Sequence, residues 1–145
     1  MPRVYISSVI DAPAAKVWDK VRDFNALPRW HPRIRDSRIE NGEPSDKVGC
    51  VRDFHLQNGD RIREKLLGLS DYDLFCTYAI LESPMPLTDY VATLRLTPVT
   101  DGDRTFAEWT AEFDCAAEDA ETLVSDIGQN VFQAAFSALK RQLGT

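Results

Sequence analysis

The stretch that decides the fold is residues 89–114, DYVATLRLTPVTDGDRTFAEWTAEFD. Apolar and polar side chains alternate over 89–98 and again over 104–114, and Asp-Gly-Asp at 101–103 has the composition of a turn. A period of two predicts an antiparallel hairpin with one buried face. Runs of the same character, separated by turn signals, fill residues 33–114. The expected strands of this meander are 34–40, 48–56, 61–70, 73–82, 89–98 and 104–114.

The flanking segments complete an α+β chain. Residues 3–10 are rich in β-branched and aromatic side chains and predict a first strand. Asp11 is expected to cap a short helix that follows, and prolines bracket 26–32, where we expect a helical turn or a structured loop. Residues 118–143 predict one long helix that ends near Gly144. The expected fold is a seven-stranded antiparallel sheet curved around a C-terminal helix.

The long helix is expected to bury one apolar face, interrupted by Gly128. We interpret this glycine as a sign of close packing, of ligand access or of simple tolerance. The residues at helical spacing on this face are Leu123, Val124, Ile127, Val131, Ala134, Ala135, Ala138, Leu139 and Leu143.

Length and composition limit the classes of protein that the sequence fits. The 145 residues correspond to a single domain, 1–145, with 43% hydrophobic and 28% charged residues. A net charge of −6 disfavours nucleic acid as a partner, and no apolar stretch reaches membrane-spanning length. With no signal sequence evident at the N-terminus, we expect a cytoplasmic protein. Three widely separated cysteines predict neither a zinc site nor a disulfide set.

The turn at Asn58-Gly59 decides which side chains of two strands share a face. A two-residue turn pairs His55 with Ile62, whereas a three-residue loop with a bulge pairs Phe54 with Glu64 and places Arg52 one diagonal step from Glu64. We prefer the second register, which gives one face that is apolar except for Arg52 and Glu64. Its complement, predicted to face water, comprises Asp53, His55, Arg61, Arg63 and Lys65.

Later strands predict a matching inner face that is rich in aromatic residues. Tyr78, Tyr90 and Trp109 fall on the apolar side of their strands, and the two tyrosine hydroxyls need polar partners there. The full inner set is Leu74, Cys76, Tyr78, Ile80, Tyr90, Ala92, Leu94, Leu96, Ala107, Trp109, Ala111 and Phe113.

Several stretches of the chain resemble the START-like superfamily, and in particular its bacterial polyketide cyclase/dehydrase-like branch. The resemblance spans the chain and is carried by VIDAPAAKVW at 9–18, LPRWHP at 27–32, VGCVR at 48–52, PMPLTDY at 84–90 and Trp109. It implies a helix-grip fold with a hydrophobic ligand cavity between the sheet and the C-terminal helix. The superfamily uses that cavity for ligand carriage, including lipid transport, for sensing and for cyclisation, so the fold alone does not define the function.

Within this cavity, Arg52 and Glu64 are the strongest candidate pair, because an isolated buried charge is costly and each needs the other. The pair is interpreted either as a structural ion pair or as a site in which Arg52 donates to a ligand carbonyl or carboxylate and Glu64 accepts a proton. His31 is a second candidate for proton transfer, with a capping or surface histidine as the alternative. The expected ligand-binding residues are Arg52, Phe54, Glu64, Tyr78, Tyr90, Trp109, Ile127 and Val131.

Three functions fit these residues. The leading hypothesis is the binding of a hydrophobic or aromatic small molecule, lipid-like or polyketide-like. The second is a cyclase or dehydratase in which Glu64 or His31 moves protons and Arg52 stabilises an enolate. The third is a protein-interaction module. No nucleotide-binding, metal-binding or nucleophile motif occurs, so no cofactor is expected, and a homodimer is considered possible. The loop 83–88 is interpreted as a lid, an ordinary connection or a partner contact.

Overall fold

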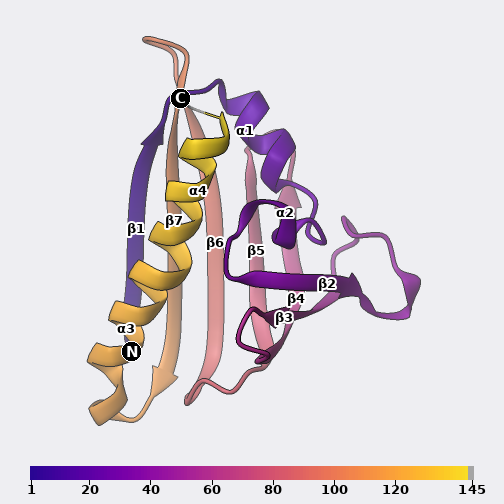
Figure 1. Cartoon of the computed structure of the whole chain (residues 1–145), viewed down its shortest axis with the longest axis vertical. Coiled ribbons are helices and arrows are strands. Elements are labelled where there is room, and N and C mark those ends of the chain that lie inside the picture. Colours follow the sequence, from indigo (N-terminus) through magenta and orange to yellow (C-terminus); the bar gives the residue numbers. More distant parts are fainter. Residues whose placement is uncertain (144–145) are drawn as a thin grey trace.

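The computed structural model of the chain describes residues 1–143 and confirms the α+β architecture (Figure 1). Seven strands form one antiparallel sheet in the order β1-β7-β6-β5-β4-β3-β2, so β1 and β2 are its edges. Strands β2 to β7 follow one another as a meander, and the last strand, β7, also pairs with the first strand, β1. The strands are β1 (Arg3–Ile10), β2 (Ile34–Ile39), β3 (Val51–Leu56), β4 (Arg61–Ser70), β5 (Phe75–Glu82), β6 (Leu87–Val99) and β7 (Arg104–Cys115).

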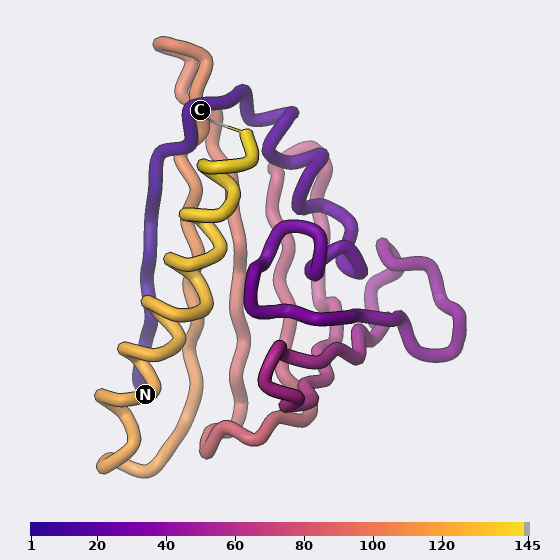
Figure 2. Tube along the Cα trace, viewed as in Figure 1, coloured from indigo at the N-terminus to yellow at the C-terminus, as the bar shows by residue number. Residues whose placement is uncertain are grey.

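Helical segments cover one face of this sheet. The C-terminal helical segment crosses in front of β1, β7 and β6 as one continuous rod, beside the N-terminal strand (Figures 1 and 2). Its middle is a π-helix, and the expected end near Gly144 lies outside the described residues. The helical elements are α1 (Ala14–Val21), α2 (Leu27–Trp30), η1 (Glu40–Gly42), η2 (Ala117–Asp119), α3 (Ala120–Asp126), the π-helical η3 (Ile127–Gln133) and α4 (Ala134–Leu143).

Side chains of helix α1 attach it to the turn between β4 and β5. The predicted Asp11 cap is wrong, because Pro13 occupies the N-cap position and no side chain caps the helix. Trp18 Nε1 and Arg22 Nε instead donate to Asp71 Oδ1 at 2.8 and 2.7 Å, in the turn between β4 and β5. The hydrogen bond from Arg22 is the main cause that lowers the pKa of Asp71. These bonds fix the start of the loop that leads to α2.

The π-helical segment changes which residues of the long helix are buried. Phe132 is absent from the predicted apolar face, yet it is fully buried and stacks on Trp109 with ring centroids 4.5 Å apart. Val131, which was predicted to be buried, is only partly buried. A π-helix closes its hydrogen bonds over five residues and so shifts the phase of every side chain that follows. Gly128 packs against Val4 and Ile6 of β1, which supports the close-packing interpretation.

The predicted register of the β3–β4 hairpin is wrong. Arg52 lies directly opposite Glu64 and Phe54 opposite Ile62. Leu56 N donates to Asp60 O at 2.8 Å and Gly59 N donates to Leu56 O at 2.9 Å, so the loop contains three residues, 57–59, as predicted. The actual and predicted pairings differ by two residues, an even number, which leaves every side chain on its predicted face. Arg52, Phe54 and Glu64 are therefore buried on the inner face, as expected.

On the outer face, Asp53 does not point to water as predicted but is 3% exposed. Arg61 covers it with a bidentate contact at 2.9 and 2.7 Å, and Arg38 of the edge strand adds a third contact at 3.4 Å. Hydrogen bonding to Arg61 is the main cause that lowers the pKa of this carboxyl group. Arginine side chains therefore cover the carboxylate of Asp53 on the outer face of the hairpin.

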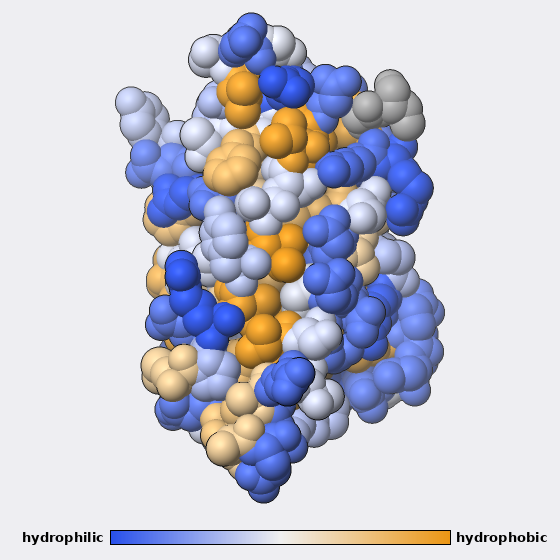
Figure 3. Space-filling view, turned by 90° about the vertical axis from the view of Figure 1, so that its left-hand side faces the viewer, coloured by the Kyte–Doolittle hydropathy of each residue, from blue (hydrophilic) through white to orange (hydrophobic). Residues whose placement is uncertain are grey.

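The side of the molecule that contains β1 exposes apolar side chains. Viewed from the side of β1, a stripe of apolar residues runs the length of the molecule between hydrophilic borders (Figure 3). Val9 and Tyr5 of this edge strand are each 44% exposed. Within residues 1–143, no helix has the length and hydropathy needed to cross a membrane.

Replacing Phe132 with alanine is expected to lower the free energy of unfolding by about 3–5 kcal/mol, because it removes a fully buried ring from the stack on Trp109. The matched control is Val131→Ala, which removes a partly buried side chain from the same π-helical turn and is expected to cost less than half as much. Urea unfolding followed by circular dichroism measures both. A larger loss for Val131→Ala would contradict the observed helix phase.

Candidate functional site

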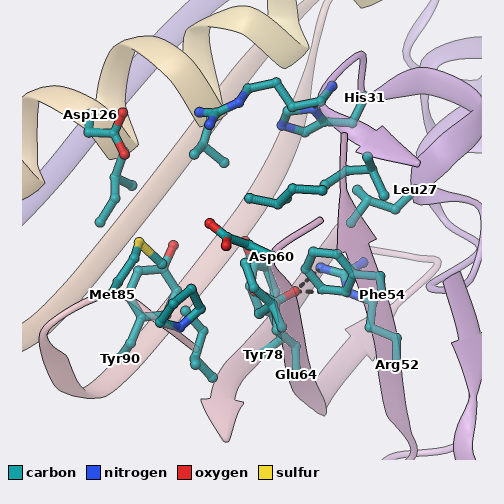
Figure 4. A pocket seen from close by; sticks show the side chains of 18 of the residues that line it. Leu27, His31, Arg52, Phe54, Asp60, Glu64, Tyr78, Met85, Tyr90 and Asp126 are labelled. Atoms are coloured by element: carbon teal, nitrogen blue, oxygen red, sulfur yellow. Dashed lines mark hydrogen bonds and ion pairs between the residues drawn. The ribbon is translucent and has the colours of Figure 1, made fainter. Parts of the chain in front are cut away.

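A cavity of about 130 Å³ lies between the inner face of the sheet and the C-terminal helical segment (Figure 4). Cavities of about this size hold one aromatic ring. Its walls come from α2, from strands β2 to β7 and from the π-helical segment η3. The lining residues are Leu27, His31, Arg33, Ile34, Arg52, Phe54, Leu56, Asp60, Ile62, Glu64, Tyr78, Ile80, Pro84, Met85, Tyr90, Trp109, Asp126, Ile127 and Val131.

The Arg52–Glu64 ion pair forms part of this wall. Arg52 Nε and Nη2 both contact Glu64 Oε1, at 2.9 and 2.7 Å, and each side chain is 7% exposed. The two residues are direct cross-strand partners, which corrects the predicted diagonal placement. Burial raises the pKa of Glu64, and the charge and hydrogen bonds of Arg52 oppose that rise. Burial therefore makes this carboxylate a better proton acceptor than an exposed one.

Aromatic rings and a backbone carbonyl complete the surroundings of Arg52. Its guanidinium carbon lies 3.9 Å from the ring centroid of Phe24 and 4.9 Å from that of Tyr78. Arg52 Nη1 donates to the Phe24 carbonyl at 3.1 Å. Cation–π contacts of this kind are strongest where water is excluded. Phe24 was not expected at the site, since it lies in a loop before α2 and its sequence context gives no sign of this contact.

The two tyrosines lie next to each other on the inner face, with ring centroids 6.4 Å apart. Tyr78 Oη accepts a hydrogen bond from Trp109 Nε1 at 3.1 Å, which leaves the hydroxyl proton of Tyr78 available. Burial raises the pKa of both tyrosines, so both hydroxyls stay protonated at neutral pH and are able to donate hydrogen bonds. Trp109 in turn packs on the helix through Phe132 and Phe136.

His31 lies across the cavity from Glu64 and Tyr78 (Figure 4) and is 2% exposed, so its interpretation as a surface histidine is wrong. Its Nδ1 accepts a hydrogen bond from the backbone N–H of Arg33 at 3.2 Å, which assigns the proton of the neutral ring to Nε2. Burial lowers the pKa of His31 to about 4, the nearby backbone of Val131 opposes this fall, and the charges of Arg33 and Arg52 add to it. The contact with Val131 does not have hydrogen-bond geometry, so Nε2 has no hydrogen-bond partner in the described chain.

Charged residues from three different elements form the rim of the cavity. Asp126 ends α3, Asp60 lies in the β3–β4 turn and Arg33 follows α2. Arg33 Nη1 donates to the Asn130 carbonyl at 3.4 Å, and the Asn130 amide donates to Asp126 at 2.6 Å. These contacts link the loop after α2 to the π-helical segment.

Every residue predicted to bind a ligand or move protons lines this cavity. The rim residues Arg33, Asp60 and Asp126 are not predictable from the sequence, because they lie in a loop, a turn and a helix end without a recognisable motif. Met85 and Pro84 of the loop interpreted as a lid also line the cavity. Phe136 is fully buried behind Trp109 and does not line the cavity. In residues 1–143, no three His, Cys, Asp or Glu side chains are grouped to hold a metal ion.

The sheet, the helix that crosses it and the enclosed cavity define a helix-grip α+β protein. Residues 1–144 match the family described as polyketide cyclase / dehydrase and lipid transport, and the chain belongs to this family. This finding confirms the resemblance inferred from the sequence motifs. A comparison with curated proteins gave no match.

Solved structures of bacterial proteins share the fold over nearly the whole chain. A Thermobifida fusca protein is 33% identical, with a TM-score of 0.88 over 98% of this chain and 93% of its own. The protein XoxI from Bacillus cereus is 26% identical, with a TM-score of 0.87 over 99% and 96% of the two chains. The Zhui aromatase/cyclase from Streptomyces sp. R1128 is 18% identical, with a TM-score of 0.80 over 97% and 92%, which is a likeness of fold.

The buried histidine predicts a pH dependence of stability. The folded protein keeps His31 neutral down to about pH 4, whereas the unfolded chain binds that proton near the ordinary histidine pKa of 6.5. The stabilisation is therefore complete above the unfolded pKa and is lost as the pH falls toward the folded one. From about pH 7 to about pH 4.5 the free energy of unfolding is expected to fall by about 2 kcal/mol through this group.

The measurement is urea unfolding of wild type and His31→Asn across this pH range. The asparagine oxygen can still accept from the Arg33 N–H, but the side chain does not titrate. Subtracting the two profiles removes the contribution of the carboxyl groups. Parallel profiles would show that His31 does not titrate as its burial requires.

Proposed function

We propose that this protein binds a hydrophobic small molecule in the cavity between the sheet and the C-terminal helical segment. The observation that carries the proposal is an opening of about 130 Å³ inside an otherwise closely packed core, lined by aromatic and aliphatic side chains. A chain whose interior serves stability alone gains by filling such a space, since each missing contact costs free energy.

In this proposal, the lining residues have two roles. Phe54, Ile127 and Val131 supply apolar contact, together with the ring of Trp109. Glu64 and the tyrosine hydroxyls orient the ligand through hydrogen bonds. His31 contributes an N–H donor without a partner, a group whose burial costs about 1–3 kcal/mol until an acceptor reaches it. Met85, with its flexible thioether, covers the rim and adapts to the ligand.

A second candidate function is acid–base catalysis in the same cavity, as a cyclase or dehydratase. Glu64 favours it, because burial raises the pKa of this carboxyl group and brings it closer to the range in which general bases work. The tyrosine hydroxyls are then the donors that stabilise an enolate oxygen. His31, whose pKa of about 4 makes it a weak base, serves as a donor in this scheme. The family description names both cyclases and lipid transport.

The binding proposal is tested by fluorescence titration with N-phenyl-1-naphthylamine, an uncharged hydrophobic probe whose phenyl ring can occupy the cavity while the naphthyl rings extend toward the rim. Wild type is expected to show saturable binding at one site. Val131→Trp places a large side chain into the cavity and is expected to weaken binding at least about 10-fold. Gln129→Trp is the matched control, since Gln129 is exposed on the same helical segment and does not line the cavity.

Retention of probe binding in Val131→Trp, with the same affinity as in Gln129→Trp, would place the probe elsewhere and overturn the proposal. Circular dichroism of both variants establishes that each is folded. The cytoplasmic location and the homodimer stay predictions from the sequence.

A further inference from the structure

We propose that Glu64 makes the cavity selective for uncharged ligands that carry a hydroxyl group, and that it excludes carboxylates of the same shape. The inference rests on the proposed ligand-binding function and names the ligand chemistry of that site. Two observations support it. Arg52 uses its guanidinium nitrogens within the protein while one oxygen of Glu64 stays free among the described residues, and the residues that line the cavity carry more negative than positive charges.

The positive charge of Arg52 is already matched within the protein. Three nitrogens of the guanidinium group are engaged, two with Glu64 Oε1 and one with the Phe24 carbonyl. The ring of Phe24 lies against the guanidinium group, with 3.9 Å between the guanidinium carbon and the ring centroid. A ligand carboxylate would need a guanidinium group that is free to turn toward it, and turning Arg52 would leave Glu64 as an uncompensated buried charge.

One carboxylate oxygen of Glu64, Oε2, is free to accept a hydrogen bond. Both contacts from Arg52 go to Oε1, and no group in residues 1–143 donates a hydrogen bond to Oε2. An ionised carboxylate oxygen only accepts, so a ligand satisfies it by donating, as a hydroxyl group does. The tyrosine hydroxyls of the same wall (Figure 4) can donate to the oxygen of that ligand hydroxyl. A hydroxyl group thus meets the needs of the carboxylate and of the tyrosines together.

The remaining charges of the cavity also disfavour an anion. Three lining residues carry carboxylates, namely Asp60, Glu64 and Asp126, and two carry guanidinium groups, namely Arg33 and Arg52. His31 is neutral at pH 7. The rim guanidinium of Arg33 donates to a helix carbonyl. An anionic ligand would therefore enter a site with an excess of negative charge, in which the buried carboxylate of Glu64 is the one least screened by water.

Three naphthyl probes separate these effects, because one ring can occupy the enclosed part of the cavity and the other can extend toward the rim. The probes are 2-naphthol, which donates a hydrogen bond, 2-methoxynaphthalene, which is uncharged without a donor, and 2-naphthoate, which is anionic. Calorimetric titration at pH 7 is expected to give 2-naphthol an affinity at least about 10-fold above that of either other probe, as a hydrogen bond to a charged group predicts.

The outcomes of this series distinguish the inference from the function on which it rests. Equal affinity for 2-naphthol and 2-methoxynaphthalene, or binding of 2-naphthoate as tight as that of 2-naphthol, overturns the inference and leaves ligand binding in place. Absence of binding by all three probes overturns the proposed function together with the inference.

The variant Glu64→Gln tests the residue itself. It leaves the charge of Arg52 unmatched, so binding of 2-naphthoate is expected to become at least about 10-fold tighter than in wild type, and the preference for 2-naphthol over its methyl ether is expected to fall. Glu82→Gln is the matched control, since Glu82 is exposed and does not line the cavity. Unchanged discrimination in folded Glu64→Gln overturns the assignment to Glu64. Should this variant fail to fold, the wild-type probe series decides by itself.

Discussion

The buried ion pair between Arg52 and Glu64 is the constraint on which the site depends. A guanidinium group stays protonated in any protein environment, so placing one inside the sheet obliges the chain to bring a carboxylate and further acceptors to it. The direct pairing of β3 with β4 supplies the carboxylate, and the loop after α1 supplies the Phe24 carbonyl and ring. The bonds from Trp18 and Arg22 to Asp71 fix the start of that loop.

The cavity exists because the aromatic side chains are concentrated around Trp109. Phe132 and Phe136 press the helix onto this indole ring, and Trp30 packs on it from α2. Between β3–β4 and the π-helical segment, by contrast, the side chains are held apart: the ion pair fixes one wall and His31 the other (Figure 4). The polar groups therefore limit how far the core can collapse, which gives the protein its interior space.

The sequence predicted faces better than it predicted pairings or burial. Alternation placed Arg52, Phe54 and Glu64 on the inner face correctly, because a register error of two residues preserves the face. The loop of three residues was predicted, but the pairings assigned to it were displaced by two residues, so the direct contact between Arg52 and Glu64 was not foreseen. The burial of Asp53 depends on Arg38 and Arg61 from neighbouring strands, and that of His31 depends on tertiary packing of α2. Phe132 was missed because the spacing rule assumes an unbroken α-helix.

Because it is π-helical, the segment η3 makes one wall of the cavity depend on the number of residues in that segment. Because its hydrogen bonds span one residue more than those of an α-helix, removing a single residue from 127–133 would let the segment relax into regular α-helix. The lining residues Ile127 and Val131 would then turn relative to the sheet, while α4 could keep its packing on β1. Insertions and deletions at this one point would reshape the ligand-facing wall without disturbing the strands, which gives the fold a simple evolutionary route to new ligand shapes.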